Sequence, residues 1–155
     1  MFAADTTRTA DAHALTALFE RLSESWGAMN PEEYAGAFTE DADYVTFIGT
    51  HLHGRRQIHE SHEALWTHFQ KDTRLYGKIR SLRFVTEDVA IMITEGAILK
   101  KDRIAPKPAD LKVQTLVAVR RPEGWRFSSF HNTRHRRLME RIAAKKDARI
   151  APEAL

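Results

Sequence analysis

Apolar side chains recur every three or four residues in the first part of the chain. Between Thr9 and Met29 the apolar positions are Leu15, Leu18, Phe19, Leu22 and Trp26. This spacing predicts an amphipathic helix with one buried face. Asn30 is a favoured capping residue and Pro31 suits the first helical position, so a second, short helix is predicted from Pro31 to about Phe38.

A third helix is predicted to begin at Gly54, again from the apolar spacing. Its stripe consists of Ile58, His62, Leu65, Trp66 and Phe69. His62 belongs to this otherwise apolar face, so we expect it to point inward. Between the second and third helices the sequence predicts a turn at Asp41–Asp43, a strand at Tyr44–Phe47, a turn at Gly49 and a short strand at His51–His53.

After Asp72 the apolar period changes to two, which is typical of strands. Four long strands are predicted, over Arg74–Thr86, Val89–Leu99, Leu111–Arg121 and Trp125–Thr133. The stretch RRPEG between the last two predicts a tight hairpin connection. Three helices followed by an antiparallel meander predict an α+β domain, in which the helices cover one face of a curved sheet.

The composition is that of an ordinary globular protein. The chain has 155 residues, of which 43% are hydrophobic and 29% charged, and this length suits one domain with its own core. The absence of cysteine excludes disulfides and thiol nucleophiles and fits a reducing compartment. We find no signal peptide and no run long enough to cross a membrane, so we expect a cytoplasmic protein.

Positive charge is concentrated at the end of the chain. The formal net charge is +3, and the excess lies after Asn132, in TRHRRLMERIAAKKDAR. We therefore divide the chain into a domain over residues 1–135 and a basic, partly helical tail over residues 136–155. The tail has no interleaved aromatic residues, so we do not expect nucleic-acid binding, although contact with nucleic acid or an acidic partner stays an alternative function.

Three segments carry a resemblance to a known family. They are WGAMNPEEYAGAFTEDADYVTFIGTHLHGRRQI, EDVAIMITEG and VQTLVAVRRPEGWRFSSFHNTR. The chain resembles the SnoaL-like branch of the nuclear transport factor 2-like superfamily, in particular the SgcJ/EcaC group, from about Ala10 to Arg134. The resemblance implies a cone-shaped fold, in which a strongly bent, mainly antiparallel sheet wraps around helices and leaves a pocket. It also implies a homodimer formed through the outer sheet face.

The resemblance does not extend to the steroid isomerases of this superfamily. Their catalytic aspartate would fall near Thr46, their second acid near Thr115 and their helix-one tyrosine near Ser23, and none of these positions keeps the required side chain. We therefore do not expect steroid isomerase activity. The chain also has no glycine-rich dinucleotide fingerprint after a strand, so we expect no cofactor and do not transfer the oxidoreductase label of the SgcJ/EcaC group.

Two histidines are the leading candidates for chemistry. Strand alternation places Trp125, Phe127, Ser129, His131 and Thr133 on one face, and the resemblance implies that this face looks into the cone. His131 and His62 would then meet in one cavity as general acid and base. The ligand would contact Trp26, Tyr44, Thr46, Trp66, Phe69, Glu95, Gln114, Thr115, Ser129 and Asn132.

The expected substrate is a hydrophobic, oxygenated small molecule such as a polyketide intermediate, which the protein would isomerise, cyclise or hydrate. The alternative is a non-catalytic protein that binds or carries such a compound, or assembles with a biosynthetic enzyme. In that case each histidine would be buried, neutral and hydrogen-bonded. Glu95 would be an inward base only if its strand has the assumed phase, because a slip of one residue turns it outward.

The histidine-rich stretch from His51 to His68 raises the question of a metal. It contains HLH at 51–53 and HESH at 59–62, with His68 beyond. HESH differs from the HExxH spacing of zinc enzymes, and on a helix His59 turns away from His62. We therefore expect no metal site.

Overall fold

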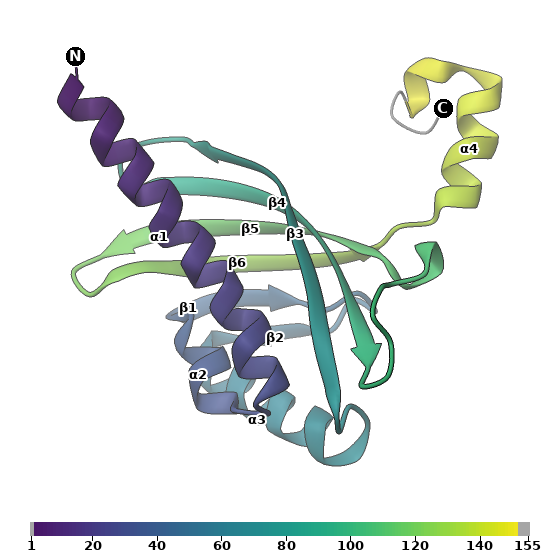
Figure 1. Cartoon of the computed structure of the whole chain (residues 1–155), viewed down its shortest axis with the longest axis horizontal. Coiled ribbons are helices and arrows are strands. Elements are labelled where there is room, and N and C mark those ends of the chain that lie inside the picture. The colour runs from purple at the N-terminus through teal and green to yellow at the C-terminus, as the bar shows by residue number, and fades with distance from the viewer. Residues whose placement is uncertain (1, 152–155) are drawn as a thin grey trace.

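The computed structural model describes residues 2–151, with helices packed against one six-stranded sheet (Figure 1). The helices are α1 (Phe2–Gly27), α2 (Pro31–Gly36), α3 (Gly54–His68) and α4 (Arg137–Lys146). The strands are β1 (Phe38–Val45), β2 (His51–His53), β3 (Thr73–Phe84), β4 (Val89–Lys100), β5 (Lys112–Arg121) and β6 (Gly124–Arg134). Short 3₁₀ turns cover Pro108–Asp110 and Ala148–Ile150. No helix in the described part of the chain combines the length and apolarity needed to cross a bilayer.

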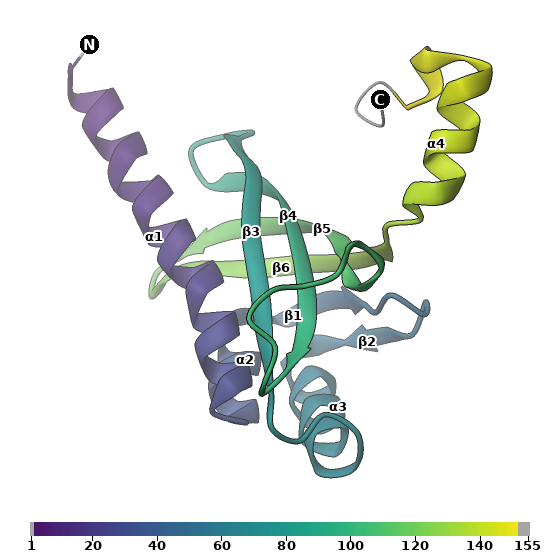
Figure 2. The same ribbon diagram turned by 45° about the vertical axis from the view of Figure 1, so that its right-hand side comes forward.

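The sheet has the strand order β2-β1-β6-β5-β4-β3. All neighbouring strands are antiparallel except β1 and β6, which are parallel. The register shifts between Ile79 and Ser81 in β3, and between Val117 and Ala118 in β5. Such irregularities bend a sheet, and β3 and β4 indeed cross over β5 and β6 at a steep angle in both views (Figures 1 and 2).

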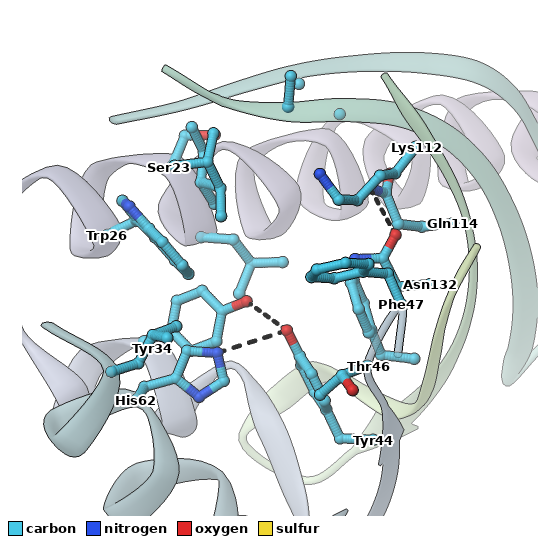
Figure 3. A pocket seen from close by; sticks show the side chains of 18 of the residues that line it. Ser23, Trp26, Tyr34, Tyr44, Thr46, Phe47, His62, Lys112, Gln114 and Asn132 are labelled. Carbon is cyan, nitrogen blue, oxygen red and sulfur yellow. Dashed lines mark hydrogen bonds between the residues drawn. The ribbon is translucent and has the colours of Figure 1, made fainter. Parts of the chain in front are cut away.

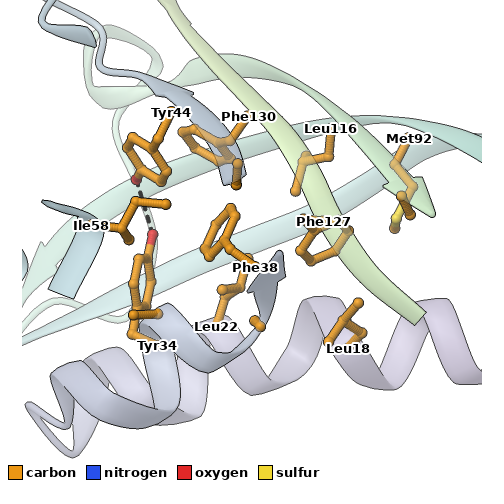
Figure 4. Close-up of a cluster of buried hydrophobic side chains, with 14 of the residues drawn as sticks. Leu18, Leu22, Tyr34, Phe38, Tyr44, Ile58, Met92, Leu116, Phe127 and Phe130 are labelled. Carbon is orange, nitrogen blue, oxygen red and sulfur yellow. Dashed lines mark hydrogen bonds between the residues drawn. The ribbon is translucent and has the colours of Figure 1, made fainter. Parts of the chain in front are cut away.

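The main core lies between α1 and the concave face of this sheet. Leu18 and Leu22 of α1 approach Phe38 and Phe127, which are completely buried (Figure 4). The rings of Phe38 and Phe127 have centroids 5.9 Å apart. Burial of each large apolar side chain contributes about 1.5–3 kcal/mol, so this row fixes α1 on the sheet and positions the residues that follow it.

The structure confirms the α+β, cone-like prediction, with helices on a strongly curved, mainly antiparallel sheet. The turn predicted at Asp41–Asp43 is wrong, because these residues belong to β1. Asp41 and Asp43 are exposed, whereas Ala42 between them is completely buried. This is the side-chain alternation of a strand that has solvent on one face. Helix α4 lies in the tail and projects away from the sheet (Figure 1).

Candidate functional site

A cavity of about 270 Å³ lies between the helices and the concave sheet face. Its apolar wall includes Leu22 of α1, Leu65 of α3, Ile98 of β4 and Phe130 of β6. Figure 3 shows two polar groups around it, one formed by Tyr34, Tyr44 and His62 and the other by Lys112, Gln114 and Asn132. A mostly apolar cavity with a few converging polar groups is the usual form of a small-molecule site.

Tyr34, Tyr44 and His62 form a hydrogen-bonded chain of three buried side chains. The hydroxyl oxygens of Tyr34 and Tyr44 are 3.0 Å apart, and Tyr44 Oη is 3.4 Å from His62 Nε2. His62 Nδ1 lies 2.7 Å from the Ile58 carbonyl oxygen. A carbonyl only accepts, so Nδ1 carries the proton and Nε2 accepts from Tyr44. Tyr44 then uses its one proton on His62, and the Tyr34 hydroxyl donates to Tyr44.

Burial keeps all three groups of this chain uncharged. Burial lowers the pKa of His62 to about 4, against the smaller opposing effect of the Ile58 carbonyl. Burial likewise raises the pKa of Tyr34 to about 12 and that of Tyr44 well above its ordinary value. At neutral pH both phenol protons and the imidazole acceptor are engaged within the chain, so a ligand carbonyl oxygen can bind to it only by replacing one of these hydrogen bonds.

Local sequence signals account for this convergence. The Asn30 side chain accepts from the Glu33 N–H and Pro31 opens α2, so the short helix is held in register and Tyr34 points inward. His62 lies on the buried, apolar face of α3, and Tyr44 lies at an inward-facing position of β1. The tilted rings of Tyr34 and His62 are packed with centroids 4.2 Å apart, which restrains the imidazole.

The second polar group is held by neighbouring strands. Gln114 accepts a hydrogen bond from the Thr94 hydroxyl at 2.7 Å and donates one to Asn132 at 3.3 Å. Gly96 permits this arrangement, because a Cβ at this position would lie only 2.8 Å from Gln114 Nε2. The amides of Gln114 and Asn132 are thereby oriented towards the cavity.

Lys112 brings a cation to the same side of the cavity. Partial burial lowers the pKa of Lys112, and repulsion from Arg134 adds to this effect. Its ammonium lies 4.9 Å from the centre of the Phe47 ring and donates to the Asp110 carbonyl oxygen at 3.3 Å. An anionic or strongly polarised ligand oxygen at this position would reverse the lowering of the Lys112 pKa, because it favours the charged amine.

His131 does not reach the cavity, so the prediction that it meets His62 there is wrong. Leu116 pairs with Phe130 and Ala118 with Phe127, which leaves Ser128 as an extra residue in β6. This bulge reverses the side-chain alternation, so that Phe130 and Asn132 face the cavity while His131 is exposed. Ser129, which was also expected inside, is turned away with His131.

The other predicted ligand contacts divide into two groups. Trp26, Tyr44, Thr46, Gln114 and Asn132 line the cavity. Trp66 is buried behind it and packs edge to face on Trp26 with centroids 5.3 Å apart. Phe69 is 79% exposed beyond the end of α3. Thr115 and Glu95 have the outward strand phase, and Glu95 Oε2 lies 3.6 Å from Arg137 of α4.

Tyr34, Lys112 and Phe47 are among the cavity residues that the sequence prediction did not name. Tyr34 lies four residues before Phe38 in the predicted short helix. This spacing places both side chains on one helix face and would have indicated that Tyr34 points inward. Lys112 lies two residues before Gln114 and therefore shares its strand face. Phe47 was predicted as the last residue of a strand, whereas β1 ends at Val45 and Phe47 lies in the following loop, where strand alternation does not apply. Among the described residues, the side chains that could ligate a metal together lie outside this cavity, on the β1–β2 hairpin.

Comparisons with known proteins agree with this architecture. A family model described as "Calcium/calmodulin dependent protein kinase II association domain" matches residues 11–136. A comparison with curated proteins found no match. A Nostoc punctiforme domain of unknown function with a cystatin-like fold has 29% identity and a TM-score of 0.79, over 89% of this chain and 85% of that one.

Two further structures show the same fold at lower identity. An NTF2-like protein from Novosphingobium aromaticivorans has 17% identity and a TM-score of 0.70, over 87% of this chain and 88% of that one. Hexachlorocyclohexane dehydrochlorinase LinA-type3 from Novosphingobium barchaimii has 20% identity and a TM-score of 0.69, over 84% and 90%. The predicted cone fold is thus confirmed, whereas none of these matches supports the narrower SgcJ/EcaC group.

Proposed function

The chain belongs to the calcium/calmodulin dependent protein kinase II association domain family, and from this premise we propose that it binds a hydrophobic, oxygen-bearing small molecule in its cone. A polyketide-type intermediate is the substrate class we favour, because such compounds combine an apolar skeleton with carbonyl and hydroxyl groups. The cavity of about 270 Å³ suits a compact member of that class.

The observation that carries this proposal is the buried chain Tyr34, Tyr44 and His62 beside an apolar cavity. Burying three polar side chains costs free energy, which their mutual hydrogen bonds only partly offset. A packing role would be served as well by phenylalanine and leucine. Binding of a ligand oxygen, which would replace one of the hydrogen bonds among these side chains, would explain why all three are polar.

In the catalytic form of the proposal, the chain moves one proton on and off the ligand. A proton leaving a carbon beside a ligand carbonyl would pass to the Tyr44 oxygen as the Tyr44 proton moves to Nε2 of His62. The reverse transfer would return a proton to a different ligand atom, which completes an isomerisation without oxidant or reductant. Lys112 would stabilise the negative oxygen that develops in between.

Matched histidine variants test this role. The expected result is that His62→Gln lowers turnover of a bound polyketide-type ketone, whereas His131→Gln, on the exposed outer face, turns over like the wild type. Ligand affinity is measured in parallel by quenching of tryptophan fluorescence, because Trp26 lines the cavity. Equal turnover in both variants would exclude proton transfer by His62.

The second candidate is a carrier that binds the same compound without changing it. It is favoured by the position of His131, because the two histidines proposed as acid and base do not share a cavity. A pKa of about 4 also makes His62 a weak base. A carrier would return its ligand chemically unchanged after prolonged incubation, and His62→Gln would alter affinity alone.

We further propose that the working form is a cytoplasmic homodimer. The outward residues of β4 and β5 include Ile91, Ile93 and Val117, which are only half-buried in the single chain. Apolar side chains in the middle of a sheet face are stabilised when a second copy covers them. The family's name refers to association, which supports a self-associating form.

A further inference from the structure

Outside the cavity, three side chains with metal-ligating atoms meet on the β1–β2 hairpin. Asp43 comes from β1, and His51 and His53 come from β2. One ligand atom from each of the three lies within 4.8 Å of the others, and this is the one such group among residues 7–151, whose side chains the structure describes. Asp43 lies on a different strand from the two histidines, so the spacing of residues within a single helix or strand could not reveal this group.

The strand pairing fixes this arrangement in the backbone. His51 and His53 are two residues apart, so their side chains leave the strand on the same face. Asp43 is the antiparallel partner of His53, and Val45 is the partner of His51. Asp43 therefore lies on that face as well, directly beside both imidazoles. The two imidazole rings have centroids 4.0 Å apart.

One of the two separations from Asp43 already matches a metal coordination shell, and the other is shorter. His51 Nε2 lies 2.7 Å and His53 Nδ1 lies 3.3 Å from the same carboxylate oxygen of Asp43. Ligand atoms at about 2.0–2.1 Å from a tetrahedral zinc ion are about 3.3 Å from one another. The separation of His53 from Asp43 already matches this value, whereas an ion would require His51 Nε2 to move away from the carboxylate oxygen.

We propose that Asp43, His51 and His53 form a binding site for a divalent transition metal ion such as Zn²⁺. Two imidazoles and one carboxylate are ligands that zinc accepts, and three protein ligands leave a coordination position for water or another donor. Two further histidine–carboxylate pairs in the described part of the chain, His59 with Glu32 and His135 with Glu140, each offer a single imidazole.

The site is accessible to an ion from solution. The side chains of Asp43, His51 and His53 are 54%, 44% and 69% exposed. β2 has only three residues and forms one edge of the sheet, so it pairs with β1 over a short length. A metal bound across the two strands would hold β2 against β1.

The loop that joins β1 and β2 in this hairpin also lies at the cavity. Phe47 and Ile48 lie between the two strands and contribute to the cavity lining. An ion that fixes the ends of the loop reduces its conformational freedom, and a ligand would then lose less entropy on binding. Zinc and a cavity ligand should therefore bind cooperatively if the proposed function holds, whereas zinc binding itself does not depend on that function.

The test is a titration of the metal-free, full-length protein with ZnCl₂ by calorimetry, and with CoCl₂ by visible absorption. We expect one equivalent of metal to bind, with the absorption bands of cobalt in a low-symmetry nitrogen and oxygen site. His51→Gln and Asp43→Asn should each weaken binding by at least about tenfold, because loss of a direct ligand exceeds the loss of a supporting contact. His131→Gln is the matched control, since His131 is exposed on the same sheet face but two strands from His51.

A second readout identifies the ligand atoms. Long-range proton–nitrogen spectra of the imidazoles should show zinc-dependent shifts at Nε2 of His51 and Nδ1 of His53, with the other histidines unchanged. The substituted side chains are exposed, so circular dichroism should show native folding for every variant. Absence of zinc binding to the wild type, or equal affinity in His51→Gln and His131→Gln, would overturn the proposal.

Discussion

Replacement of His62 by glutamine should change how the stability of the protein depends on pH. His62 is 4% exposed, and burial lowers its pKa from 6.5 to about 4. In the unfolded chain the imidazole gains a proton as the pH falls through about 6.5. In the folded protein it does so only near pH 4, so between these values the unfolded state binds more protons. Stability must therefore decrease as the pH falls through this window.

The size of the effect follows from the two pKa values. A group with a pKa of 6.5 unfolded and about 4 folded removes about 2–3 kcal/mol of stability between pH 7.5 and pH 4.5. Glutamine keeps an N–H for the Ile58 carbonyl but does not titrate. The variant should be less stable at pH 7.5, because it loses the ring contact with Tyr34, yet it should lose about 2–3 kcal/mol less on acidification.

Urea denaturation at pH 7.5 and pH 4.5, followed by circular dichroism, measures this difference. His131→Gln is the control, because it makes the same substitution at a histidine that is exposed on the sheet. If wild type and His62→Gln lose the same free energy of unfolding between the two pH values, His62 is not held neutral by burial. The description of the buried hydrogen-bonded chain would then be wrong.

Three further substitutions address packing, a buried contact and association. Gly96→Ala should lower the melting temperature and weaken ligand binding, because the new Cβ would lie only 2.8 Å from Gln114 Nε2 and force that side chain to move. An unchanged melting curve would contradict this. Asp11→Ala should cost about 1–3 kcal/mol in urea denaturation, since it leaves the Trp125 indole N–H buried without its acceptor at 3.0 Å; a cost within error would show that water replaces the carboxylate. Ile93→Lys on the outward face of β4 should reduce the mass measured by analytical ultracentrifugation to that of one chain, and an unchanged mass would exclude this face as the interface.

Much of the fold could be predicted because its signals are local. The apolar stripes of α1 and α3 and the period of two in the long strands are set by the buried faces of those elements. Asn30 and Pro31 similarly indicated the start of α2. Asp41 and Asp43 misled the prediction, because aspartate favours turns and here lies in a strand with solvent on one face.

The site was harder to predict because it depends on relations between elements. One extra residue at Ser128 reverses the alternation of β6, and no single-strand pattern reveals a bulge. His62 and Gln114 were nevertheless placed correctly, since each lies in a segment without such an irregularity. The meeting of Asp43 with His51 and His53 depends on strand register, which sequence period alone does not give.

Native mass spectrometry of freshly purified protein can detect a small molecule that is bound in the cone. Thr50→Trp, which places a bulky ring at a residue lining the cavity, is compared with Thr67→Trp on the exposed face of α3. We expect wild type and Thr67→Trp to carry a small hydrophobic compound, which denaturation releases, and Thr50→Trp to carry none. A wild-type protein that carries no ligand and also binds none from a set of polyketide-type ketones would contradict the proposal that the cone binds a small molecule.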